Sequence, residues 1–318
     1  MDEKYVNRFL RREFRVVGWL LAAYYGIMNI LTVAAVFSDV LRQFLQSLSR
    51  GQFPGNPDIH ALMGNGWGYV ATVAVGLLFL FCWKEDRFWK ESVLASHGRM
   101  TVGVFAVLAC LCMAAQLVNS LWIAGLELVM NQFDRSVMDI LESVSGQSDT
   151  FSMFLYASIL APVSEELIFR GYILQTLRPY GKKFAIVLSA FLFGIFHGNL
   201  LQTPYAFLMG LVLGYVTVEY HIGWAVALHV FNNLVLADLL TRLTGGLSEQ
   251  ASEAVSLVLL GGAAIAAGVV LIVKRKRIGE YIRSDWMDRR CVKCFFTNSG
   301  VIVLMVLMAL NVLTVMGL

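Results

Sequence analysis

The sequence predicts an all-α protein, a polytopic helical bundle that crosses a membrane about eight or nine times. Of its 318 residues, 58% are hydrophobic and only 15% are charged, whereas soluble domains are about half apolar and a quarter charged. A spanning helix needs roughly 20 mainly apolar residues, and stretches close to that length recur along the chain. Lysine and arginine gather in alternate connections between these stretches, as they do in membrane proteins.

Nine apolar segments are the candidate spans. They cover residues 16–37, 67–83, 101–123, 151–177, 184–197, 205–218, 223–240, 254–273 and 300–317. The fifth and sixth are short for a full span, so we expect them to tilt or to be shielded by neighbouring helices. Between the third and fourth, residues 131–150 are polar and acidic, which favours a short amphipathic helix on the outer face.

The charges of the loops predict the orientation. If the N-terminus is cytoplasmic, most of the 25 Lys and Arg residues lie in cytoplasmic connections, and the external ones keep only Arg42, Arg50, Arg135 and Arg242. This asymmetry follows the positive-inside rule and predicts a multi-pass protein of the cell membrane with a cytoplasmic N-terminus. We divide the chain into N-terminal accessory helices (1–150), a core (151–240) and C-terminal helices with a basic cytoplasmic loop (241–318).

The core holds ionisable side chains inside apolar helices, and each such group costs about 2.5–3.5 kcal/mol to place in a membrane. Glu166 and Arg170 are four residues apart, share one helical face and are expected to pair. Glu165 points about 100° away and has no partner in its own helix. Pro162, one turn earlier, is expected to kink the helix and to free backbone groups near the acids.

Two histidines and an asparagine follow in later helices. His197 ends the fifth segment, and His229 and Asn233 share one face of the seventh. At 1.5 Å per residue, Glu165, His197 and His229 lie about 18, 20 and 10 Å from the cytoplasmic ends of their helices. These depths predict one polar layer and a single site. Asn232 is expected to face elsewhere in a structural role, since buried amides often bridge helices.

These residue types suit peptide hydrolysis. A carboxylate can take a proton from water, a histidine can orient that water, and an amide can stabilise an oxyanion. The patterns E-E-x-x-x-R at 165–170, F-x-x-x-H at 193–197 and H-x-x-x-N at 229–233 resemble the three motifs of the CPBP intramembrane proteases. That family includes type II CAAX prenyl endopeptidases, Ras-converting enzymes, and bacterial Abi and lysostaphin-resistance-protein-A-like proteins. The resemblance covers roughly residues 151–240.

The resemblance implies a role for each motif residue. Glu165 would activate a water molecule together with His197, and Glu166 with Arg170 would support this first acid. The protein would then be a membrane-embedded endopeptidase. Its substrate would be a membrane-associated or lipidated protein or peptide, reached laterally from the lipid or from the cytosol.

The same resemblance implies that His229 and Asn233 bind the oxyanion. It leaves the cofactor open, because both a zinc metalloprotease and a metal-free glutamate mechanism have been argued for the family. If a metal takes part, Glu165, His197 and His229 would be its ligands and one position on the ion would stay open. The sequence lacks the His-Glu-x-x-His helix motif of soluble zinc proteases.

Two other classes of function stay open on the residues alone. An ion-coupled transporter would also place Glu and His inside the membrane, although no inverted repeat or pair of broken helices is evident in the sequence. A non-proteolytic scaffold or bacteriocin-immunity protein would bind a peptide without cutting it. The net charge is only +3, and the sequence has no basic domain with interleaved aromatic residues. Both observations argue against a nucleic-acid partner. Membrane lipid and a peptide or lipidated protein are the expected partners.

Overall fold

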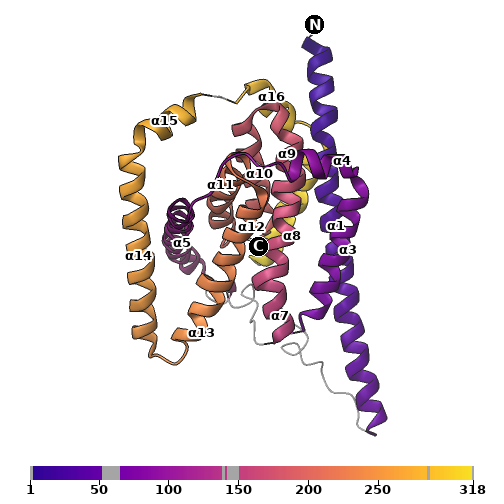
Figure 1. The fold of residues 1–318 in the computed structure, drawn as a ribbon. Coiled ribbons are helices and arrows are strands. Elements are labelled where there is room, and N and C mark those ends of the chain that lie inside the picture. The colour runs from indigo at the N-terminus through magenta and orange to yellow at the C-terminus, as the bar shows by residue number, and fades with distance from the viewer. Residues whose placement is uncertain (1–2, 52–64, 138–139, 142–149, 285–286, 317–318) are drawn as a thin grey trace.

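The structure is a computed structural model that describes residues 3–51, 65–137, 140–141, 150–284 and 287–316, and every regular element among them is helical (Figure 1). The first part contains α1 (Glu3–Ser49), α3 (Trp67–Trp83), α4 (Asp86–Phe88), η1 (Trp89–Val93), α5 (Val102–Met130), η2 (Asn131–Phe133), α7 (Phe151–Leu155), η3 (Tyr156–Leu160), α8 (Ala161–Glu166) and η4 (Leu167–Ile173). The second part contains α9 (Leu174–Leu177), η5 (Arg178–Tyr180), α10 (Lys182–Phe196), α11 (Thr203–Glu219), α12 (Ile222–Phe231), η6 (Asn232–Leu239), α13 (Leu240–Thr244), α14 (Glu249–Val273), α15 (Arg275–Arg283), α16 (Arg289–Phe296) and α17 (Ser299–Val315). The all-α class predicted from the composition is confirmed for this part of the chain.

Helix length and composition give the candidate membrane spans. Four described helices are long and apolar enough to cross a membrane: Glu3–Ser49, Val102–Phe133, Phe151–Tyr180 and Gln250–Val273. Two sharply bent pairs raise the number to six if each is one span: Trp67–Trp83 with Asp86–Val93, and Arg289–Phe296 with Ser299–Val315. The two segments expected to be short form α10 and α11, with 15 and 17 residues. The multi-pass architecture is supported, whereas the count of about eight or nine spans and the division at residues 150 and 240 stay predictions.

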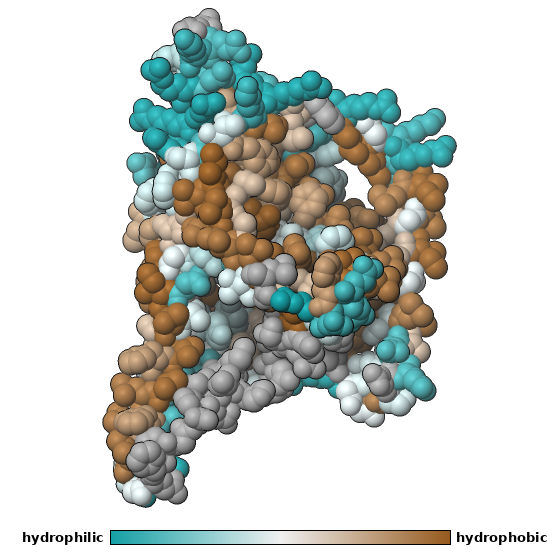
Figure 2. All heavy atoms as spheres, turned by 180° about the vertical axis from the view of Figure 1, so that it is seen from behind, coloured by the Kyte–Doolittle hydropathy of each residue, from teal (hydrophilic) through white to brown (hydrophobic). Residues whose placement is uncertain are grey.

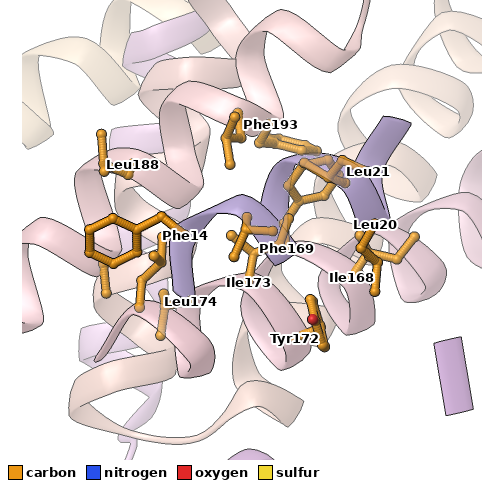
Figure 3. Packing of buried hydrophobic residues seen from close by; sticks show 14 of the residues in the cluster. Phe14, Leu20, Leu21, Ile168, Phe169, Tyr172, Ile173, Leu174, Leu188 and Phe193 are labelled. Carbon is orange, nitrogen blue, oxygen red and sulfur yellow. The ribbon is translucent and has the colours of Figure 1, made fainter. Parts of the chain in front are cut away.

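The main hydrophobic core lies where the first half of α1 meets η4 and α10 (Figure 3). Leu10, Phe14, Val17 and Leu21 are buried and recur every three or four residues, which places them on one face of α1. The ring of Phe14 lies 5.4 Å from that of Phe184 in α10. This face of α1 therefore holds it against the helices that carry the predicted site residues.

The C-terminal helix α17 crosses α1 at two glycines. A Cβ built on Gly18 would collide with the backbone of Gly300 and Val301, and one built on Gly300 would collide with the backbone of Arg15. Residues without side chains let two membrane helices approach closely and gain van der Waals contact. The two ends of the sequence are packed together by this contact.

Charged residues gather at one end of the bundle, which we call the basic end. The first turns of α1 lie toward the top of Figure 1, as do α15 and α16, and hydrophilic residues cover the same end in Figure 2. Apolar residues cover the flank below it (Figure 2). This segregation follows the pattern of loop charges, and the assignment of the basic end to the cytoplasm stays a prediction. The amphipathic helix expected within 131–150 falls partly on residues 138–139 and 142–149, which lie outside the described part.

Candidate active site

The helix that carries both acids contains π-helical turns, in which a backbone hydrogen bond spans five residues instead of four. In this pattern Ala161 donates its N–H to the carbonyl of Tyr156. The next carbonyl, that of Ala157, would need the N–H of residue 162. Pro162 has no N–H, and the side-chain amide of Asn233 donates to Ala157 instead, at 3.1 Å. The prediction that Pro162 frees backbone groups is confirmed at this carbonyl.

Glu166, Arg170 and His229 form a buried polar group that we call the inner cluster. Arg170 Nη1 donates to Glu166 Oε1 at 3.0 Å, and both side chains are completely buried. Since a carboxylate only accepts, His229 Nδ1 carries a proton and donates to the same Oε1 at 2.9 Å. The predicted pairing of Glu166 with Arg170 is confirmed, and the bond to His229 is one that the sequence did not indicate. This bond joins α12 to α8.

The ring of Phe193 and the close approach of Gly210 enclose the guanidinium of Arg170. Its Cζ lies 4.3 Å from the centroid of the Phe193 ring, within the range of a cation–π interaction. Gly210 of α11 lies so close that an added Cβ would be 3.2 Å from Arg170 Nη2 and 2.9 Å from the Cα of Ala190. Glycine at position 210 therefore leaves the space that the guanidinium needs.

Glu165 faces the other nitrogen of His229. Its Oε2 lies 3.7 Å from His229 Nε2, which is too long for a direct hydrogen bond. The side chain of Glu165 is 31% exposed, whereas that of Glu166 is 0% exposed. Glu165 is thus the acid that another molecule can reach, and Glu166 is the acid that is sealed in the protein.

His197 is held by its own helix. Its Nδ1 lies 2.9 Å from the carbonyl oxygen of Phe193, so this nitrogen carries the proton and Nε2 is left as an acceptor. The Phe193 ring contacts both histidine rings edge-on, with centroids 4.9 Å from His197 and 5.8 Å from His229. Among the described side chains, no hydrogen bond or ion pair joins His197 to Glu165. Their convergence on one water molecule stays a prediction.

Asn233 lies one helical turn beyond His229 and takes part in a chain of hydrogen bonds. Its Nδ2 donates to Ala157, and its Oδ1 accepts from Asn232 Nδ2 at 3.1 Å. Asn232 Oδ1 in turn accepts from the hydroxyl of Tyr205 at 2.6 Å. The expectation that Asn232 faces away from Asn233 is wrong. The two side chains bond each other although they leave neighbouring positions of the chain, at the point where the π-helical segment η6 begins.

The comparison with known families bears on this part of the chain. Residues 147–235 match the family model of type II CAAX prenyl endopeptidases, Rce1-like. The resemblance is confirmed. The Rce1-like segment contains all the predicted site residues and indicates a membrane endopeptidase of the CAAX-protease type. No curated protein and no solved structure matches the chain.

The residues named as ligands of a possible metal do not form a metal site. Among the residues that the structure describes, no three His, Cys, Asp or Glu side chains are placed to hold one metal ion. His229 directs Nδ1 at Glu166, and His197 directs Nδ1 at its own backbone, which leaves Nε2 of each ring as the nitrogen that could hold a metal. These two nitrogens and the carboxylate of Glu165 are not gathered around one point in this arrangement.

Proposed function

We propose that the protein is an intramembrane endopeptidase that hydrolyses a peptide bond of a membrane-associated or lipidated substrate. The observation that supports this most directly is the unequal exposure of two adjacent acids. Glu165 is reachable, and Glu166 is sealed in the inner cluster behind it. A reachable carboxylate beside an imidazole nitrogen, within an Rce1-like segment, suits general-base hydrolysis.

Glu165 acts as the general base in this proposal. It removes a proton from a water molecule, and the resulting hydroxide adds to the carbonyl carbon of the peptide bond. His197 accepts a hydrogen bond from the same water through Nε2, because its Nδ1 already donates to Phe193. When the carbon–nitrogen bond breaks, Glu165 gives its proton to the departing amine, and the carboxylate is restored.

His229 and Asn233 stabilise the oxyanion that forms on the peptide carbonyl oxygen. Glu166 holds Nδ1 of His229, so Nε2 is the nitrogen that faces Glu165 and the substrate. His229 donates to the oxyanion from Nε2 as an imidazolium, which carries a proton on each ring nitrogen and whose charge is balanced by the carboxylate of Glu166. Asn233 uses one N–H of its amide for Ala157 and has a second N–H for the oxyanion. A preorganised donor of this kind is worth about 10²–10³ in turnover.

The position of the acids limits the kind of substrate. Glu165 lies inside the candidate span Phe151–Tyr180, so a peptide has to reach it from the lipid or from an end of the bundle. A lipid anchor brings a peptide into the membrane, and the name of the matching family refers to prenylated substrates. We therefore place membrane-bound or lipidated peptides in the substrate class. Peptide binding without cleavage is the outcome that the experiment below separates from hydrolysis.

Glu165→Gln tests the proposal, because glutamine keeps the shape of glutamate but cannot take a proton from water. We expect at least ~10²-fold slower cleavage of a lipidated reporter peptide by the purified protein in detergent, with an unchanged melting temperature. Glu91→Gln is the matched control, since Glu91 is 62% exposed in a surface pair with Arg87 and should leave cleavage unchanged. A folded Glu165→Gln protein with full activity would remove Glu165 from the mechanism. A wild-type protein that binds the peptide and leaves it intact would support the scaffold function.

A further inference from the structure

We propose that Tyr205 and Asn232 are positioning residues that fix the side-chain amide of Asn233 for catalysis. This rests on the proposed role of Asn233 as an oxyanion donor. Neither residue is one of those that define the three motifs. Tyr205 lies in the first turn of α11 and Asn232 at the start of η6, so the two come from different helices.

The direction of the hydrogen-bond chain is set at its far end. The carbonyl oxygen of Ala157 only accepts, so the group of Asn233 that faces it is the amide nitrogen. Asn233 Oδ1 then faces Asn232, which has to offer its own amide nitrogen. Asn232 Oδ1 is left toward Tyr205, whose hydroxyl donates to it. A single orientation of both amides satisfies all three bonds.

The starting point of this chain is a consequence of the sequence. Ala157 has no backbone donor in the π-helical register because residue 162 is proline. A carbonyl left in this way needs a side-chain donor, and Asn233 supplies it. The Asn233 amide therefore has a fixed acceptor on one side and a fixed donor on the other.

The second N–H of Asn233 is the one that matters for chemistry. Because both ends of the amide are held, this N–H keeps its direction before a substrate arrives, and a donor that need not reorganise is the effective kind in an oxyanion site. Asn232 is only 8% exposed, so water competes little for these bonds, and hydrogen bonds in a low-dielectric surrounding are stronger. Loss of Asn232 or of the Tyr205 hydroxyl frees the Asn233 amide to rotate.

Tyr205→Phe removes one hydroxyl and little else. We expect kcat for cleavage of the lipidated reporter peptide to fall about three- to tenfold, as the loss of one hydrogen bond predicts, with KM unchanged. Tyr215→Phe is the matched control on the same helix. Tyr215 contacts Tyr220 and Tyr281 rather than the hydrogen-bond chain that includes Asn233. The kcat of the Tyr215→Phe protein should therefore stay at the wild-type value.

A double-mutant cycle with Asn233→Ala separates positioning from a general structural role. Asn233→Ala should lower kcat about 10²-fold, and Tyr205→Phe should cause no additional loss in that background. Asn232→Leu, which keeps the branched shape but removes the whole amide, provides a second route. It should lower kcat about tenfold when Asn233 is present and have no effect when Asn233 is alanine.

The possible results decide between the two proposals. Equal losses from Tyr205→Phe in both backgrounds would overturn the positioning role, since Tyr205 would then act without Asn233. Full turnover by the Asn233→Ala protein would overturn both the oxyanion role and the positioning role. Slow cleavage by Glu165→Gln in the same assay would still support hydrolysis, so failure of this inference is distinguishable from failure of the proposed function.

Discussion

Two ion pairs in this chain share the same sequence spacing and the same distance and differ in their surroundings. Arg87 and Glu91 are four residues apart with an N–O distance of 3.0 Å, and so are Glu166 and Arg170. The first pair is 80% and 62% exposed, and both members of the second are 0% exposed. A surface pair contributes about 0–1 kcal/mol, whereas breaking a buried pair by removing one partner costs about 3–5 kcal/mol. Burial, and not geometry, decides which pair the fold depends on.

Arg170→Ala is expected to have the largest effect on stability. It leaves the buried charge of Glu166 with the hydrogen bond from His229 but without its arginine partner, so the free energy of unfolding should fall by about 3–5 kcal/mol, together with expression and activity. Arg87→Ala removes the corresponding charge of the surface pair, and the change there should stay within about 0.5 kcal/mol. Denaturant titration of both variants in detergent measures the difference. Equal losses in the two variants would contradict the contrast drawn between buried and exposed pairs.

Glu166→Gln extends the comparison between buried and exposed groups to the two adjacent acids of the site. The amide keeps the shape of the acid and its oxygen can still accept a hydrogen bond, but the negative charge is lost, so the free energy of unfolding should fall by a smaller amount, about 1.5–3 kcal/mol. Activity should fall as well, because His229 loses the partner of its Nδ1. Glu165→Gln, by contrast, should lose activity without loss of stability, since Glu165 is partly exposed. Melting temperatures and cleavage rates measured on the two variants side by side test this division, and a shared stability loss would refute it.

The sequence predicted those parts of the site that depend on one helix. The pairing of Glu166 with Arg170 follows from helical spacing alone, and the helix-breaking effect of Pro162 follows from its missing N–H. The all-α class and the multi-pass character follow from apolar stretches of spanning length. The first two inferences need only residues within about one turn of each other, and the third needs only the length of single apolar stretches.

The parts that the sequence did not reveal depend on how helices rotate against each other. The bond from His229 to Glu166 joins two helices whose relative rotation is set by packing, as at the contact of Gly210 with Ala190. The contact of Asn232 with Asn233 depends on side-chain rotamers and on the hydrogen bond from Tyr205 of another helix, which residue spacing alone does not indicate. The number of membrane spans is equally hard to predict, because the sequence of a bent or short helix does not indicate whether that helix crosses the membrane.

Gly210→Ala tests how tightly the guanidinium of Arg170 is enclosed. The added Cβ would lie 2.9 Å from the Cα of Ala190, so α10 and α11 would have to move apart, at a cost of about 1–3 kcal/mol. Gly261→Ala in α14 is the matched control, because its Cβ would have nothing within 4 Å. That variant should be neutral or more stable by about 0.5–1 kcal/mol, since alanine loses less backbone entropy than glycine. Equal melting temperatures for the two variants would show that the bundle is looser here than its contacts indicate.

The smallest effect is expected at the basic end, where His97 forms a polar contact that water reaches. Arg178 Nη1 lies 3.0 Å from His97 Nε2, and since a guanidinium only donates, the histidine accepts and is neutral at that nitrogen. Burial, followed by the charges of Arg178 and Lys182, lowers the pKa of His97 below its ordinary value of 6.5, and Glu219 opposes this. Protonation of His97 would replace an accepted hydrogen bond by a repulsion between two cations.

The direction of the resulting pH dependence follows from the lowered pKa. The unfolded chain, in which His97 titrates normally, binds more protons in weak acid than the folded chain does, so stability should decrease as the pH falls below about 6.5 and stay constant above it. In His97→Gln this slope should become shallower, because glutamine does not titrate. Denaturation of both proteins at pH values on either side of 6.5 measures the change. Identical slopes would mean that water screens this contact completely, which would place it with Arg87 and Glu91 at the weak end of the comparison.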